Sequence, residues 1–277
     1  MLLGICFDCR PSDAVNAELN IPYVVQFGFG SYDIGGLSAT TFRIPLAHNF
    51  KLDPEDDGLR IKFTGYLGFS HLTFDTRLAN DEFKASQEFL FALPQAELIV
   101  PLAKGWTLKP YLAAGAGWAF NGSKQLNGTP EESITDSYIF LYTAGAGTLY
   151  EIPVEKFRVS LGSKIGWAEA REIGGSGKQG YATLQAGTEI RHPLGVHLSG
   201  HELSLAGSFI YYFFFPPAQF SMPEGKPLKV THQFEFGTTF GFVEPAKIWF
   251  IENPQIGMSY RFGDGMTGFR VNLGFPF

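Results

Sequence analysis

The sequence predicts an all-β fold: a closed, antiparallel transmembrane β-barrel of about twelve strands in up-and-down order. Apolar and polar residues alternate along much of the chain, as in strands with one apolar and one polar face. Only 17% of the 277 residues are charged, whereas Phe and Gly number 28 and 33; soluble domains contain about a quarter charged residues. No segment reaches the ~18 apolar residues of a spanning helix. Inside a membrane, only a closed barrel could then satisfy every backbone group.

The last stretch, residues 266–277, shows the alternation most clearly. Its apolar residues share one face and are separated by polar or small residues: Phe269, Val271, Leu273, Phe275 and Phe277. Such a strand fits a lipid-facing outside and a polar lumen. We therefore expect the whole stretch to be the closing strand.

Eleven earlier segments have similar alternation. The expected strands cover residues 23–30, 42–47, 59–70, 95–102, 106–120, 138–152, 157–167, 184–191, 203–215, 233–242 and 256–262. Together with the last stretch they give an even number, which suits bacterial single-chain barrels.

The expected connections alternate in length. If the C-terminus lies on the periplasmic side, the turns on that side are short, apart from one longer turn: 54–58, 103–105, 153–156, 192–200 and 244–247. The connections on the other side are mostly longer: 31–38, 75–82, 121–136, 173–180, 216–228 and the hairpin 263–265. Short turns inside and long loops outside are typical of outer-membrane barrels.

Four aromatic residues are expected at the rims of the apolar band: Trp106, Trp118, Phe157 and Trp167. At ~3.3 Å per residue and ~40° tilt, the first two stand about 30 Å apart and the last two about 25 Å. These spacings favour aromatic girdles at both interfaces. The alternative is chance placement, with Trp118 an ordinary strand aromatic.

The opposite strand faces predict a basic lumen. The charged residues expected to face inward are Arg43, Arg60, Lys62, Glu97, Lys109, Arg158, Lys164, Glu189, Arg191, Glu235, Arg261 and Arg270. Charged side chains facing lipid would cost about 2–4 kcal/mol each near the midplane. The placement of these charged residues on one face of the strands therefore supports the barrel. Two interpretations follow: a structurally filled lumen, which we favour, or a small anion-preferring channel.

Residues 1–20 are expected to form an N-terminal segment ahead of a barrel over residues 21–277. The segment is either the remnant of a leader or a lumen plug. Residues 8–19 carry three acids and could form a short helix capped by Ser12 or Asp13. Cys6 and Cys9 indicate a local disulfide or processed leader residues rather than a zinc site.

No catalytic residue, metal site or cofactor is expected. His192, His197 and His201 lack a full ligand set and fit a solvated turn. Ser70 and His71 are adjacent, so their side chains should point to opposite faces of a strand. An outer-membrane hydrolase is therefore the least favoured function. The net charge of −6 and the inward basic residues also argue against nucleic-acid binding.

Over residues 20–277 the chain resembles bacterial outer-membrane β-barrels. The ending G-F-R-V-N-L-G-F-P-F looks like the signal that such proteins present to the barrel-assembly machinery. The strand count is similar to that of an autotransporter translocator domain, and the chain resembles the solitary autotransporter-like barrels. The resemblance implies the Gram-negative outer membrane as location, and the lipid bilayer and the assembly machinery as partners. It also implies a helix inside the pore, for which residues 8–19 are short. The oligomeric state stays open.

Overall fold

The computed structural model describes residues 21–52, 58–78, 81–130, 136–175, 177–220, 227–244, 247–248 and 251–277. The elements are α1 (Ile21–Val25), β1 (Phe29–Ile34), β2 (Leu37–Lys51), β3 (Arg60–Leu78), β4 (Asp81–Ala103), β5 (Trp106–Leu126), β6 (Thr129–Pro130), β7 (Ser137–Val154), β8 (Phe157–Glu172), β9 (Lys178–Leu198), β10 (His201–Phe220), β11 (Leu228–Phe242), β12 (Lys247–Ile248), β13 (Ile251–Glu252), β14 (Ile256–Gly263) and β15 (Met266–Asn272). Three strands, β6, β12 and β13, are two-residue strands within connections.

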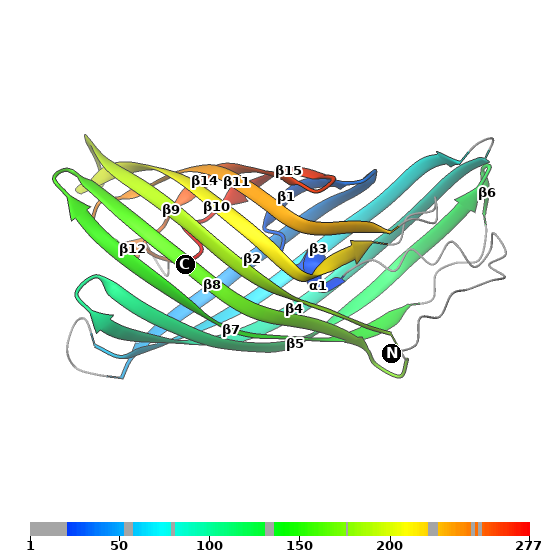
Figure 1. Ribbon diagram of the computed structural model, residues 1–277, viewed down its shortest axis with the longest axis horizontal. Helices are drawn as coiled ribbons and strands as arrows, with labels where there is room; N and C mark the ends of the chain where they lie inside the picture. Colours follow the sequence, from blue (N-terminus) through cyan, green and yellow to red (C-terminus); the bar gives the residue numbers. More distant parts are fainter. Residues whose placement is uncertain are drawn as a thin grey trace.

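The other strands form a closed antiparallel barrel of twelve strands, as the sequence predicts (Figure 1). Each pairs with its neighbour in the chain, and β1 pairs with β15 to close the ring. This closing register runs from Phe29 opposite Val271 to Ile34 opposite Met266. We call the end of the barrel where β15 finishes the inner end, and the opposite end the outer end.

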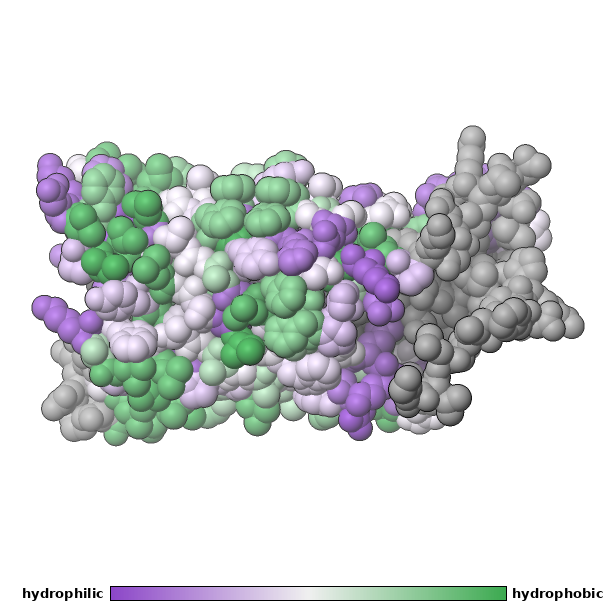
Figure 2. All heavy atoms as spheres, viewed as in Figure 1, coloured by the Kyte–Doolittle hydropathy of each residue, from purple (hydrophilic) through white to green (hydrophobic). Residues whose placement is uncertain are grey.

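The outside of the wall is apolar. Leu112, Leu161 and Phe236 are 61%, 45% and 54% exposed, and their neighbours along the strands point inward. On the face shown in Figure 2, hydrophobic side chains cover the wall, while hydrophilic ones gather in a band toward the right-hand end and at the left-hand rim. Among the described residues, no helix has the length and hydropathy needed to cross a membrane. The alternation in the sequence therefore predicted the outward face of the strands correctly.

The expected first strand, residues 23–30, is wrong. Residues 21–25 form α1, which lies inside the barrel (Figure 1), and β1 starts only at Phe29. Tyr23, Val24 and Phe27 are each 1% exposed. These residues are apolar because they are buried in the lumen. In the sequence they therefore resemble the apolar residues of an outward-facing strand. The expected turn 31–38 is also shorter, since β1 continues to Ile34 and β2 begins at Leu37.

The strands extend further at the outer end than the sequence indicates. The described parts of the expected loops 75–82, 121–136 and 216–228 are mostly strand, because β3 reaches Leu78, β5 reaches Leu126 and β10 reaches Phe220. Outside the apolar belt both faces can be polar, so the alternation fades although pairing continues. In β4, for instance, Lys84 Nζ lies 2.8 Å from Glu82 Oε1. Residues 54–57 of the expected turn 54–58, and the loop tips 79–80, 131–135 and 221–226, lie outside the described residues.

Three of the inner turns are tight. β4–β5, β7–β8 and β9–β10 are joined by residues 104–105, 155–156 and 199–200, with positive φ at Gly105, Glu155 and Ser199, as two-residue hairpins require. The expected turn 192–200 is therefore mostly strand. The expected short turn 244–247 is instead part of a longer connection, residues 243–255, that carries β12 and β13.

The C-terminal stretch is a strand only in part. β15 ends at Asn272, and Gly274 has a φ of +122°. That backbone conformation and Pro276, which has no N–H to donate, interrupt the ladder. Phe269 and Leu273 face outward, 61% and 57% exposed, whereas Phe275 and Phe277 pack against the core in the lumen. The expectation of one strand through residue 277 is thus wrong.

Candidate functional site in the barrel lumen

Apolar side chains fill the outer half of the lumen around α1, and we call this region the outer plug. Tyr23 makes edge-to-face contacts with Phe27, Phe214 and Phe220, at centroid distances of 4.9, 5.2 and 5.2 Å. Phe27 stacks on Tyr32 at 4.2 Å. The surrounding wall residues are buried, among them Ile34, Leu72, Phe74, Tyr181, Ile210 and Val230. Side chains from opposite strands thus meet across the lumen.

Hydrogen bonds fix α1 to the closing strands. The Tyr23 hydroxyl lies 3.0 Å from Met266 Sδ, and Gln233 Nε2 donates to the Tyr23 oxygen. On the opposite side, Arg43 Nη1 donates to the carbonyl oxygen of Val25 at 3.1 Å. The helix is therefore held from both β2 and β11–β15.

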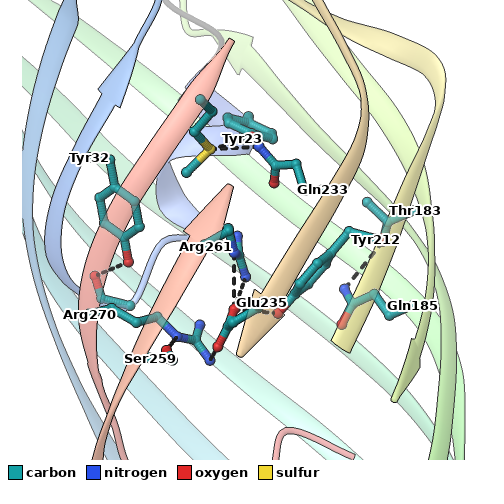
Figure 3. A network of polar contacts seen from close by, with 12 residues as sticks. Tyr23, Tyr32, Thr183, Gln185, Tyr212, Gln233, Glu235, Ser259, Arg261 and Arg270 are labelled. Atoms are coloured by element: carbon teal, nitrogen blue, oxygen red, sulfur yellow. Dashed lines mark hydrogen bonds and ion pairs between the residues drawn. The ribbon is translucent and has the colours of Figure 1, made fainter. Parts of the chain in front are cut away.

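One buried carboxylate organises an ion network between β10, β11, β14 and β15, which Figure 3 shows at close range. Glu235 Oε2 accepts from Arg261 Nε at 3.0 Å and from the Tyr212 hydroxyl at 2.9 Å. Arg270 Nη2 lies 2.9 Å from Glu235 Oε1, and Arg270 Nε donates to Ser259 Oγ at 3.1 Å. The Arg261 guanidinium also covers the Tyr212 ring, 4.0 Å from its centroid. Both cations of the network are thus matched by a carboxylate and further partners.

A second buried pair lies on β9. Arg191 Nη2 contacts Glu189 Oε1 at 2.9 Å, and Arg191 Nη1 donates to Ser204 Oγ at 3.0 Å. Gln255, from the inner connection, accepts from Arg191 Nη2 at 2.9 Å. This pair ties the connection 243–255 to the wall.

A different arrangement occurs toward the inner end on β2, β3, β4, β5 and β8. Five cations and one carboxylate lie there, and we call them the inner cation cluster: Arg43, Arg60, Lys62, Lys109, Lys164 and Glu97. Lys62 and Glu97 are opposite each other in register, but within the described residues no ion pair joins them. Lys164 Nζ instead sits 4.1 Å from the Tyr111 ring centroid, and the Arg43 guanidinium 4.6 Å from that of Tyr66. These cations are held by aromatic faces and backbone rather than by carboxylates.

Residues 273–277 reach across the lumen to the opposite wall. A side chain on Gly162 of β8 or on Gly187 of β9 would collide with the ring of Phe277. Lys109 Nζ donates to the Phe277 carbonyl oxygen at 2.9 Å. The two glycines thus form a socket for Phe277.

The remaining residues singled out in the sequence lie near the ends of the wall. Trp106, Trp118, Phe157 and Trp167 are 45%, 38%, 43% and 39% exposed. Trp118 stacks on Tyr138 at 6.3 Å, and Phe157 on His192 at 4.8 Å. Arg158, near the inner rim, lies 3.9 Å from Glu151. Val271, in β15, is half-buried. Their roles as girdles or assembly signal stay predictions.

The histidines and the serine–histidine neighbours also have defined places. His192 and His197 lie on β9 and His201 on β10, around the tight turn at the inner end. Within the described part of the chain, no three His, Cys, Asp or Glu residues are grouped as metal ligands. Ser70 is fully buried, while His71 lies 3.6 Å from Glu88 Oε1 on the other face of β3.

Sequence reasoning missed the aromatic residues that fill the lumen. Tyr212 and Phe214, 5% and 2% exposed, lie in the block F-I-Y-Y-F-F-F at residues 209–215. A strand apolar on both faces has lipid on one side and a dry interior on the other. The block at residues 209–215 could therefore have predicted that the lumen is apolar near the outer end.

Comparison with solved structures gives the same architecture. The translocator domain of the autotransporter NalP from Neisseria meningitidis superposes with a TM-score of 0.57 at 14% identity, over 90% of this chain and 85% of that one. The β-domain of the Bordetella autotransporter BrkA gives a TM-score of 0.53 at 12% identity, over 88% and 91%. No protein-family model and no curated protein matches the sequence. The chain therefore has the fold of the autotransporter translocator domains, a closed barrel of twelve antiparallel strands.

Proposed function

We propose that this protein is an integral outer-membrane barrel with a closed lumen, in a structural or surface role. The observation that carries this is the outer plug. Tyr23 and Phe27 are both 1% exposed. Tyr23 packs against Phe214 and Phe220 of β10, and Phe27 packs against Tyr23 and Tyr32, so these rings occupy the outer half of the lumen. A channel needs a continuous water-filled path, and the outer plug interrupts it.

The outer membrane is the proposed location because a broad apolar belt surrounds the outward face of the wall. Aromatic residues lie toward both ends of the strands, as at membrane interfaces. The lipid bilayer is then the principal partner, and the barrel-assembly machinery acts during insertion. In this proposal the charged residues of the lumen fill and cross-link the interior, and no chemical reaction is assigned to them.

Single-channel recording in planar bilayers tests the closed lumen. The full chain should be silent. Tyr23→Gly combined with Phe27→Gly should open a conductance with anion preference, because the path then passes the inner cation cluster. The matched control is Phe29→Gly, which removes an outward ring 44% exposed and should leave the barrel silent. Steady, anion-preferring conductance of the full chain would instead support the small channel.

A second candidate function is translocation of a polypeptide segment. It is favoured by one observation: the chain directly ahead of β1 lies inside the barrel as α1. The two similar structures are domains of autotransporters. A protease-sensitive tag inserted ahead of residue 21 would test it in intact cells. Cleavage by external protease would support translocation, and full protection of the tag would contradict it.

A further inference from the structure

The inner cation cluster is the least compensated group of charges among the described residues of the lumen. Arg43, Arg60, Lys62 and Lys164 have no carboxylate within ion-pair distance there, whereas Arg261 and Arg270 share Glu235. Lys164 interacts electrostatically with Arg43, Lys62 and Lys109 as well as with Glu97. The like charges therefore face a common space, where a mobile anion would be attracted.

The side chains of the inner cation cluster are less buried than those of the outer plug. Its cations are each partly exposed by surface area, whereas Tyr23 and Phe27 are each 1% exposed. Arg60 Nε is buried and has no hydrogen-bond partner. A buried N–H donor without an acceptor is costly. A ligand with several acceptor oxygens would satisfy it together with the neighbouring ammonium groups.

Next to the cluster, β2 is paired on one side only over part of its length. The register of β2 with β3 continues to Lys51, but its register with β1 stops at Thr41. Over residues 42–48, no strand lies on the β1 side of β2 within the described part of the chain. The outward side chains here, Phe42, Ile44 and Leu46, are 44%, 43% and 53% exposed, so this edge of β2 lies within the apolar belt. Backbone without a strand partner at such a depth is tolerated only where it is buried in protein or lines a water-filled cavity.

We propose that the inner cation cluster binds a phosphate-bearing anion, and that the edge of β2 gives a lipid headgroup lateral access to it. Arg60 and Arg43 supply guanidinium donors suited to phosphate oxygens, and Lys62, Lys109 and Lys164 supply charge. The same chemistry would accept free phosphate from the inner end. The site is separate from the outer plug and does not require a conducting lumen.

The test uses the full chain in nanodiscs of zwitterionic lipid. In one arm, binding of radiolabelled inorganic pyrophosphate is measured. In the other, phosphatidylglycerol is added to the nanodisc, and the lipid retained by the delipidated protein is measured by native mass spectrometry. Binding in either arm supports the proposal, and the arm that responds identifies the source. Absence of binding in both arms would overturn it.

Two variants locate the site. Lys62→Met with Lys164→Met should weaken binding at least tenfold. The matched control, Arg171→Met with Lys178→Met, removes two cations near the outer rim that are paired with Glu169 and should leave binding unchanged. Lys62→Arg with Lys164→Arg keeps the charge and should retain binding, and heat-modifiable migration verifies that each variant is folded. Equal binding by the Lys62→Met, Lys164→Met variant and the unaltered chain would overturn the proposal.

Discussion

The ion network and the inner cation cluster lie in the same lumen, yet their charges are arranged in opposite ways. In the network, Glu235 is 2% exposed and contacts both Arg261 and Arg270. In the cluster, Lys62 lies directly opposite Glu97 of the neighbouring strand, but no ion pair joins them within the described residues. Arg43 and Lys164 contact aromatic rings instead. The cations of the network each contact a carboxylate, whereas the cluster is partly exposed and has more cations than carboxylates.

This difference separates charges that hold the barrel together from charges that are available to a ligand. Burying an ion pair costs desolvation, which is offset only with good geometry and further hydrogen bonds. The network meets that condition through Tyr212 and Ser259. The inner cation cluster does not meet that condition. Its cations are partly exposed, which lowers the cost of leaving them without a carboxylate partner. At an effective dielectric constant of 20, two unit charges ~8 Å apart repel by about 2 kcal/mol. Removing a charge should therefore have opposite effects in the two regions.

The largest expected effect is at Glu235. Glu235→Gln should lower the free energy of unfolding by about 3–5 kcal/mol, since it leaves two buried guanidinium groups without a counter-charge. Urea titration in lipid vesicles, followed by tryptophan fluorescence, measures the loss. Glu97→Gln, in the inner cation cluster, is the control, and it should lower the free energy of unfolding clearly less. Equal losses at both positions would remove the distinction between the regions.

The outward face of β8 gives the next effect. Leu161→Arg should cost about 2–4 kcal/mol, because the charge would enter the apolar belt, whereas Lys164 of the same strand is tolerated in the lumen. The same urea titration applies, with Leu161→Phe as an apolar control. A neutral Leu161→Arg would show that this part of the wall does not face lipid.

A smaller effect is expected at Phe277. Its ring is half-buried, so Phe277→Ala should cost about 1–2 kcal/mol of packing. If the terminal pattern is also an assembly signal, deletion of Phe277 should reduce insertion in cells by more than this loss of stability predicts. The folded band in heat-modifiable migration, compared between cells and refolding in vesicles, separates the two effects. Phe275→Ala is the control for packing alone, and an undiminished folded band in cells would contradict the signal.

The sequence predicted the parts of the fold that face outward from the barrel. An apolar residue on every second position is enforced by the cost of exposing charge to hydrocarbon, so strands such as 106–120 and 157–167 were visible. It did not predict α1, because Tyr23 to Phe27 are apolar for a different reason, burial inside the barrel. The bend after Asn272 was hidden because apolar residues continue at alternate positions through Gly274 and Pro276.

The alternation groups the charged residues into one set expected to face the lumen and does not divide them into two regions. Parity places Arg60 and Arg261 on the same kind of strand face, yet only the register and the tilt of the strands decide which carboxylate each can reach. Glu235 meets Arg261 because the two are directly opposite in β11 and β14. Arg60 is opposite Ile99 and Lys51. The alternation within one strand does not specify which residue of the neighbouring strand lies opposite.

The central claim is tested most directly by making the same substitution in both regions. Arg261→Met and Lys62→Met each replace a cation of the lumen by a flexible apolar side chain, and their free energies of unfolding would be compared in vesicles of a non-ionic glycolipid in buffer without phosphate. The account predicts that Arg261→Met destabilises the barrel by about 2 kcal/mol or more, because Glu235 loses a partner. It predicts that Lys62→Met leaves the stability unchanged or raises it, because repulsion is relieved. A loss at Lys62 as large as that at Arg261 would contradict the account.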